Sequence, residues 1–315
     1  MRNRMLKRAA VFLIGATALA TAAPAAVAAP APAPAAVAAK APTRSMPRQH
    51  ARSNAAPAAS GVAATPVFLT PGQSLQPGQN MTSGDTTLVM QTDGNLVLYL
   101  VGPTGQHVLP LWGTNTYGNN GAYAVMQNDG NFVLYRQGGG ATTGGALWNS
   151  GTWGHSGVYA ALVDGDLMLG NDSATQPLWQ TRTGFVPTQV NGQYTDNPSD
   201  TLASNTGLPG GTWVESNTTW LVMQADGNLV LYRKSDGAAL WSTGTWNHPG
   251  MVAVMDSQGA LDIYGDNQII WSTRTWNSPG AYAKVQDDGN VVVYQQNGGP
   301  STGGALWQSG TWGKA

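Results

Sequence analysis

The chain has 315 residues, contains no cysteine and carries a charged side chain at only 10% of its positions. Without cysteine no disulfide can stabilise the fold, so apolar packing has to hold it together. Residues 1–60 carry eight Lys or Arg and no acidic residue, whereas residues 61–315 carry seven basic residues against 16 acidic ones. The acidic second part argues against nucleic acid or an anionic membrane as its main partner.

Residues 1–28 have the pattern of a secretory signal peptide. The basic start MRNRMLKR is followed by the apolar run AAVFLIGATALA and by a cleavage-type sequence, Ala26-Val27-Ala28. This run is too short to span a membrane and no other long apolar run exists, so no membrane insertion is expected. Residues 29–60 are rich in Ala and Pro, a composition that cannot bury a core. They are interpreted as a disordered stalk or a pro-segment of a protein that is secreted, free in the extracellular medium or associated with the cell surface.

The rest of the chain is repetitive at two levels. A unit of strand, Asp-Gly turn, strand and Trp motif recurs, and three such units make a group. The groups cover residues 61–183 and 201–315, and the segment 184–200, which lacks clear periodicity, is interpreted as a linker. Two domains of three repeats are therefore expected. The Trp motifs begin at Trp112, Trp148, Trp179, Trp241, Trp271 and Trp307.

The six repeating Trp residues are candidates for a core or for stacking against sugars. Because they occur in every unit, including units with altered polar residues, we expect them to converge, three per domain, on a pseudo-three-fold axis. Four further Trp residues are left open between core and surface: Trp153, Trp246, Trp276 and Trp312.

The secondary structure expected after residue 60 is entirely β. No segment there shows helical periodicity, and runs such as TTLVMQ and NLVLYL are short, rich in β-branched residues and bounded by turn signals. Asp-Gly between two such runs is a strong hairpin signal. A three-fold repeat of hairpins predicts three sheets around a pseudo-three-fold axis in each domain.

One polar pattern is superimposed on four of these hairpins: MQTDGNLVLY (90–99), MQNDGNFVLY (126–135), MQADGNLVLY (223–232) and VQDDGNVVVY (285–294). Alternation places Asn, Val and Tyr on one face of the outgoing strand, with Gln and Asp beside them. Amide, carboxylate and phenol around an aliphatic floor suit a ligand dense in hydroxyls, which indicates a sugar. Ordinary turn and strand chemistry explains the Asp, Gly and Val, but it does not explain why Gln and Tyr recur in register.

The pattern Q-x-D-x-N-x-V-x-Y resembles the signature of the bulb-type (monocot) mannose-binding lectins, the B-lectin domain. The resemblance covers the chain from about residue 61 to its end in two copies. It implies two tandem β-prism II domains, each built from three four-stranded antiparallel sheets about a pseudo-three-fold axis. Bacterial relatives in this family include secreted lectins and tandem-domain, lectin-like bacteriocins.

The resemblance also implies roles for the five residues. Asp93 and Asn95 would bind the axial 2-hydroxyl of mannose, Gln91 the 3-hydroxyl and Tyr99 the 4-hydroxyl, with Val97 against the ring carbons. The same roles would fall, in the same order, to Gln127, Asp129, Asn131, Val133 and Tyr135; to Gln224, Asp226, Asn228, Val230 and Tyr232; and to Gln286, Asp288, Asn290, Val292 and Tyr294. No metal, cofactor or catalytic residue belongs to this arrangement.

Two repeats depart from the pattern and are interpreted as scaffold. In LVDGDLMLG the five positions are assigned to Leu162, Asp164, Asp166, Met168 and Gly170. In MDSQGALDIY they are assigned to Asp256, Gln258, Ala260, Asp262 and Tyr264, so that only the Tyr remains.

The expected function is thus a secreted, multivalent and metal-independent protein that binds mannose or mannose-containing glycans, including cell-surface polysaccharide. A bacteriocin that uses the same domains to reach a rival cell's surface glycan fits the sequence equally well. A glycosidase fits poorly, because it needs two carboxylates at a set separation and residues 61–315 hold a single glutamate, Glu215. His107, His155 and His248 lie in polar, Gly-rich contexts without metal-ligand spacing, and are expected to be solvated.

The last expectation concerns the ends of the two domains. Lectins of this family commonly exchange C-terminal strands between subunits, and this chain carries both partners in tandem. Exchange of segments 178–183 and 306–312 would place Trp179 and Trp307 in the opposite domain's core. The chain would then be a monomeric pseudo-dimer, with a homodimer as the alternative.

Overall fold

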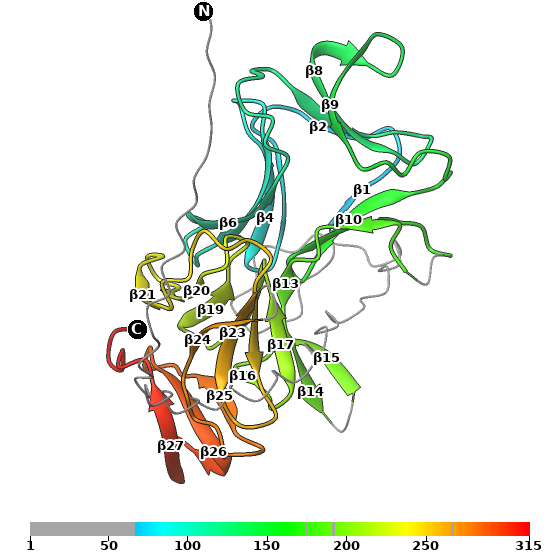
Figure 1. Ribbon diagram of the computed structural model, residues 1–315. Helices are drawn as coiled ribbons and strands as arrows, with labels where there is room; N and C mark the ends of the chain where they lie inside the picture. The colour runs from blue at the N-terminus through cyan, green and yellow to red at the C-terminus, as the bar shows by residue number, and fades with distance from the viewer. Residues whose placement is uncertain (1–66, 174–175, 191–192, 266–267) are drawn as a thin grey trace, which may run out of the picture. The chain divides into compact units, whose positions relative to one another are not determined.

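The computed structural model describes residues 67–173, 176–190, 193–265 and 268–315, which all belong to one compact unit of the chain (Figure 1). The predicted signal peptide and stalk lie outside the described residues. The described residues form β-strands and turns, with no α-helix among them. In this part of the chain no helix is long and apolar enough to cross a membrane.

The first domain consists of three four-stranded antiparallel sheets, and the segment 67–83 contributes one outer strand to each. One sheet has the order β3 (Asn80–Ser83), β4 (Thr86–Met90), β5 (Leu96–Val101) and β6 (His107–Gly113). The next has the order β2 (Ser74–Leu75), β7 (Tyr123–Met126), β8 (Phe132–Gly140) and β9 (Gly144–Asn149). The third has the order β1 (Val67–Leu69), β10 (Tyr159–Val163), β11 (Asp166–Gly170) and β12 (Trp179–Gln180).

The second domain repeats this architecture with one addition. Its first sheet has the order β13 (Gly184–Phe185), β18 (Thr212–Glu215), β19 (Thr219–Met223), β20 (Leu229–Arg233) and β21 (Ala239–Ser242). The second has the order β17 (Thr206–Pro209), β22 (Val252–Met255), β23 (Leu261–Gly265) and β24 (Gln268–Ser272). The third has the order β16 (Thr201–Leu202), β25 (Tyr282–Val285), β26 (Val291–Gly299) and β27 (Gly303–Gln308). Both domains are therefore β-prism II folds.

The segment 184–200, predicted to be a linker, contains short strands. β13 pairs in parallel with β18 and makes that sheet five-stranded, where four strands were expected. β14 (Pro187–Val190) and β15 (Gln193–Pro198) form a separate two-stranded antiparallel pair. The chain thus enters the second domain by extending one of its sheets.

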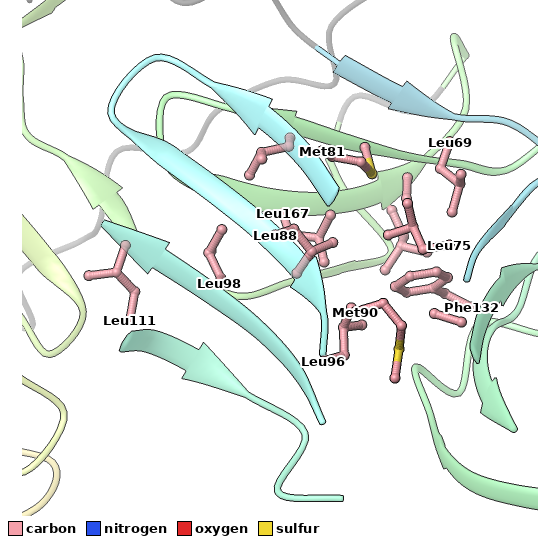
Figure 2. Close-up of a cluster of buried hydrophobic side chains, with 14 of the residues drawn as sticks. Leu69, Leu75, Met81, Leu88, Met90, Leu96, Leu98, Leu111, Phe132 and Leu167 are labelled. Atoms are coloured by element: carbon pink, nitrogen blue, oxygen red, sulfur yellow. The ribbon is translucent and has the colours of Figure 1, made fainter. Parts of the chain in front are cut away.

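The hairpin register separates the core face of each strand from its outer face. In β4 and β5, Leu88 pairs with Leu98 and both are fully buried, while Val89 pairs with Val97 on the other face. Figure 2 shows Leu88, Met90 and Phe132, which come from two sheets, inside the same cluster of buried side chains. Period-two alternation therefore supplies each sheet with one face for the core and leaves the other for polar groups.

The six repeating Trp residues close the centre of each domain, as predicted. In the first domain the rings of Trp112, Trp148 and Trp179 lie 5.5 Å apart pairwise, edge to face. In the second domain the pairwise distances within the other triad are 5.4–5.7 Å: Trp241, Trp271 and Trp307. Edge-to-face pairs add about 0.5–1.5 kcal/mol each beyond the area that they bury.

The predicted strand exchange between the two domains is wrong. β12 pairs with β11, and Trp179 contacts Trp112 and Trp148 of its own domain. β27 likewise pairs with β26, from which only residues 300–302 separate it. For β27 such a short hairpin connection returns the chain to the neighbouring strand at little entropic cost. Each domain therefore completes its own sheets.

Candidate sugar-binding sites

The structure brings the five motif residues of each complete repeat together on one hairpin. In the first repeat, Gln91 follows β4, Asp93 lies in the turn, and Asn95 precedes β5, which carries Val97 and Tyr99. At all four complete motifs the Asp is exposed and the Gln is half-buried. We refer to the motifs in chain order as sites 1 to 4.

A hydrogen bond across the hairpin joins the Gln to the Tyr at every site. The Gln amide donates to the phenol oxygen over 2.8 Å in Gln91–Tyr99, 2.9 Å in Gln127–Tyr135, 2.9 Å in Gln224–Tyr232 and 3.1 Å in Gln286–Tyr294. Because this bond uses the lone pair of the phenol, the Tyr hydroxyl proton remains able to donate to a ligand, and the Gln carbonyl oxygen remains able to accept.

The Asp and Asn of each motif are held by the turn itself. One carboxylate oxygen of the Asp accepts the backbone N–H of the Asn over 2.9–3.0 Å at all four sites. The turn glycine between them is required: Gly94 has φ +92°, and a Cβ there would lie 2.2 Å from the Asn119 carbonyl oxygen. The second carboxylate oxygen is then available to accept a hydroxyl.

A set of residues that the sequence analysis missed orients the Asn side chain. At site 1 the Asn95 Oδ1 accepts the Thr114 hydroxyl over 3.0 Å and the Thr116 backbone N–H over 3.1 Å. The same two bonds, from 2.8 to 3.2 Å, hold the other three Asn side chains through Ser150 and Thr152, Thr243 and Thr245, and Ser309 and Thr311. With the oxygen occupied, the Asn amide is left to act as a donor; at site 4 one of its two N–H groups already donates to the Gln308 Oε1 over 3.2 Å. These residues recur in the sequence in the motif W-x-(S/T)-x-T, of which only the Trp was used for prediction.

The Val residues form a closely packed floor to each site. Their exposed fractions are only 2–4%: Val97, Val133, Val230 and Val292. Only a small part of each Val side chain is therefore left to contact a ligand, because the rest is already packed against the protein.

The sites fall into two kinds according to what borders the Tyr. At site 2, Tyr135 is buried and lies 5.9 Å from Tyr123, whose hydroxyl donates to the Gly139 carbonyl of the long β8–β9 hairpin over 2.9 Å. Site 4 repeats this with Tyr294, Tyr282 and Gly298 over 5.9 Å and 2.7 Å. At site 1, Tyr99 is half-buried and its ring stacks on His107 at 4.4 Å. At site 3, Tyr232 is half-buried against a buried apolar cluster, and this burial raises its pKa.

The altered repeat of the first domain has no set of groups for a sugar. The pairing of Leu162 with Leu167 shows that Leu162 is a core residue and that Val163 holds the Gln position, because this turn is one residue shorter. The assignment of Leu162 to that position is therefore wrong. The Gly165 turn is also covered, since a Cβ on Gly165 would lie 2.4 Å from the Trp213 ring of the second domain.

The altered repeat of the second domain is filled by its own side chains. Asp256 Oδ1 accepts three backbone N–H groups over 2.7–2.9 Å. Asp262 is fully buried, and its pKa is raised by burial and by the Asp256 charge. The Tyr264 hydroxyl donates to Asp262 over 3.3 Å, and burial and that carboxylate raise the pKa of Tyr264 to about 12.

The glutamate and the three histidines considered as catalytic candidates have ordinary structural environments. Glu215 is buried, accepts the Trp213 indole N–H over 2.8 Å and pairs with Lys234 over 3.0 Å. His107, His155 and His248 are exposed, as predicted. Among the described residues no group of three or more His, Cys, Asp or Glu could hold a metal ion.

Comparisons with known proteins give structural neighbours only. No protein-family model matches the chain, and no curated protein does. Among solved structures it is similar to a monomeric monocot mannose-binding lectin of Gastrodia elata, at 33% identity over 36% of this chain and 99% of that one, with a TM-score of 0.32. It is also similar to the mannose-specific agglutinin of snowdrop, Galanthus nivalis (26% identity, 41% and 97% coverage, TM-score 0.28). The fetuin-binding, two-domain lectin of Scilla campanulata matches at 24% identity over 77% of this chain and 99% of that one, with a TM-score of 0.28.

Proposed function

We propose that this protein is a secreted, multivalent lectin that binds mannose or mannose-containing glycans through sites 1 to 4 without a metal ion. One observation carries the proposal: the same hydrogen-bonded arrangement recurs at all four complete motifs. The Gln–Tyr bond spans 2.8–3.1 Å, and the Asn Oδ1 is held over 2.8–3.1 Å by a Ser or Thr hydroxyl. Secretion rests on the N-terminal sequence.

The orientation of these groups favours a sugar with an axial 2-hydroxyl. The Asp carboxylate can accept the hydroxyl proton while the Asn amide donates to the same oxygen, so one hydroxyl satisfies both groups. An equatorial 2-hydroxyl, as in glucose, would leave one or both of them desolvated and unpaired, which costs about 1–3 kcal/mol. Preference for mannose over glucose then follows without any further contact.

Four sites on one chain would give high affinity for a polymer even if the affinity of each single site is low. A shallow site with a few hydrogen bonds to one sugar should have a Kd near 1 mM, about −4 kcal/mol. A branched mannan can engage several sites together and gain on the order of a hundredfold in affinity.

Purified residues 61–315 should bind α-mannosides on a glycan array and α-glucosides much less. Binding should be unchanged in EDTA, because the groups that face the ligand are amide, carboxylate and phenol and no carboxylate cluster of the kind that holds calcium accompanies them. An array without mannosides above background would refute the specificity. Binding that EDTA abolishes would refute the mechanism alone.

A further inference from the structure

Exposed aromatic side chains accompany the complete motifs. Tyr117 is 70% exposed, Trp153 68%, Trp246 58% and Trp312 70%. Each follows the last Thr of its W-x-(S/T)-x-T motif, the residue whose backbone N–H holds the motif Asn. Single exposed apolar residues need no explanation, but the same exposed ring at the same place beside each of four sites does.

These rings are carried by short segments that backbone hydrogen bonds join to the motif turns. We call these segments straps. The straps cover residues 116–119, 152–155, 245–248 and 311–314. The N–H of Asn119 donates to the Asp93 carbonyl over 3.0 Å, and the N–H of His155 donates to the Asp129 carbonyl over 3.0 Å. His248 and Gly313 make the equivalent bonds to Asp226 and Asp288 over 2.8 and 2.6 Å. The backbone of each ring-bearing residue is therefore fixed next to the Asp of its site.

The altered repeats provide an internal comparison. In the second domain the equivalent strap ends with Ser278, whose N–H bonds to the Gln258 carbonyl over 2.9 Å. Its ring, Trp276, is 42% exposed, less than any of the four rings beside the complete motifs. In the first domain the equivalent position is Gly184, at the start of β13. A ring that is more than half exposed thus accompanies each complete motif and neither altered one.

The fold itself does not require these rings. The straps are held by backbone hydrogen bonds and by threonine hydroxyls, such as Thr116 to the Gly94 carbonyl over 2.8 Å and Thr152 to the Gly130 carbonyl over 2.7 Å. The cores are closed by separate Trp triads. An aromatic side chain that stays in water at these positions gains no burial energy until a ligand covers it.

We propose that Tyr117, Trp153, Trp246 and Trp312 each form a second subsite that stacks against the apolar face of the pyranose linked to the sugar in the adjacent site. The inference rests on the proposed function, because the motif binds the first sugar. A flat aromatic surface complements the C–H face of a pyranose, as it does other flat ligands with an apolar face. The full recognition unit is then a disaccharide or longer oligosaccharide at each site.

The test compares a monosaccharide with an oligosaccharide on the full chain. Isothermal titration with methyl α-D-mannopyranoside and with an α-linked mannotriose is carried out on the wild type and on the quadruple variant Tyr117→Ala, Trp153→Ala, Trp246→Ala, Trp312→Ala. The variant should bind the trisaccharide about tenfold more weakly, the size of one stacking contact, and the monosaccharide within about twofold of the wild type. Trp276→Ala is the matched control and should change neither affinity.

The outcomes separate the subsite from the proposed function. If the wild type binds the monosaccharide but binds the trisaccharide no more tightly, the subsite is refuted and the lectin function stands. If the variant loses affinity equally for both ligands, the rings belong to the first sugar's site or support its strap, and the subsite is also refuted. If the wild type binds neither ligand, the proposed function fails together with the subsite.

Discussion

At the residue scale, hydrogen bonds within the protein decide which atoms of each site remain for a ligand. The Gln amide is turned toward the Tyr oxygen and the Asn oxygen toward a Ser or Thr hydroxyl, so the orientation of both amides is set before a ligand arrives. Preorganised groups lose little conformational entropy on binding. Tyr264 shows the contrast, because its hydroxyl bonds to Asp262 instead of a Gln.

Replacing Tyr99, Tyr135, Tyr232 or Tyr294 by Phe should weaken binding at one site each. The change removes one ligand hydrogen bond, worth about 0.5–1.5 kcal/mol, or roughly two- to tenfold in affinity. Titration with a mannoside should show the loss in affinity or in the number of saturable sites. Tyr264→Phe is the matched control. A loss at Tyr264 as large as at the other four would show that the assignment of sites and scaffold is wrong.

Replacing the buried Asp262 by Asn should stabilise the protein near neutral pH. Its Oδ1 has no hydrogen-bond partner in the described structure, and burial raises the pKa of the carboxyl. The native state therefore holds this proton more tightly than the unfolded chain, whose Asp pKa is about 3.9. The stabilising contribution of the protonated group is fully present below that value and is lost as the pH rises through the folded-state pKa.

Urea denaturation at several pH values measures this effect. At pH 7 Asp262→Asn should raise the free energy of unfolding by about 1 kcal/mol, and it should flatten the fall in stability above pH 4. Asp256→Ala should instead lower stability at every pH, because Asp256 accepts three backbone N–H groups. An Asp262→Asn variant that is less stable than wild type at pH 7 would contradict the argument.

At the element scale, each hairpin and the Trp motif that follows it form one functional unit. The strand that follows each hairpin brings a Trp to the core. Two residues after that Trp, a Ser or Thr bonds to the motif Asn of the same sheet. In the first sheet Trp112 lies in the triad and Thr114 bonds to Asn95 over 3.0 Å. The same short segment therefore connects core packing to site geometry.

Thr114→Val should impair site 1 while the fold persists. The variant loses the hydroxyl that holds Asn95 and the acceptor for the Leu96 N–H at 3.1 Å. Thr273→Val is the matched control, because Thr273 accepts the Leu261 N–H over 2.9 Å in a sheet where Ala260 replaces the Asn. Both variants should lose about 1–3 kcal/mol of stability. Only Thr114→Val should reduce the number of mannoside sites found by titration, and an equal reduction in both would show a general loss of structure.

At the scale of the whole molecule, the two domains share buried groups. Trp213 and Trp220 of the second domain are 1% exposed and pack with the core residues of the first. Lys234 is 2% exposed and lies 3.0 Å from Glu215 and 3.4 Å from Asp85 of the first domain. Burial raises the pKa of Glu215, while the Lys234 ammonium opposes that shift. A buried cation between two carboxylates therefore couples the domains.

Lys234→Met should destabilise the whole chain by about 3–5 kcal/mol, because it leaves Glu215 buried without its counter-charge. Denaturant unfolding followed by Trp fluorescence measures this loss. The neighbouring Arg233→Met is the control, since Arg233 pairs with Asp236 at the surface and its removal should leave the midpoint nearly unchanged. A Lys234→Met variant as stable as Arg233→Met would show that the buried charges do not couple the domains.

Features that depend on neighbours along the chain could be predicted from the sequence. The Asp-Gly turns, the strand alternation and the joining of Gln91 to Tyr99 all arise within one hairpin, where separation along the chain dictates which side chains meet. The repetition of the Trp motif likewise predicted both triads, because a residue that recurs in every unit has to meet its copies around the axis.

Features that depend on contacts between distant segments became visible in the fold alone. A terminal strand has the same sequence pattern whether it pairs within its own domain or with a neighbouring domain. The pairing of β12 and β27 within their own domains could therefore not be predicted from that pattern. Thr114, just after β6, reaches Asn95, just before β5, and Lys234 of the second domain pairs with Asp85 of the first. Their partners are set by how strands pair and how sheets pack, because buried polar side chains need hydrogen-bonding or charged partners in a low-dielectric interior.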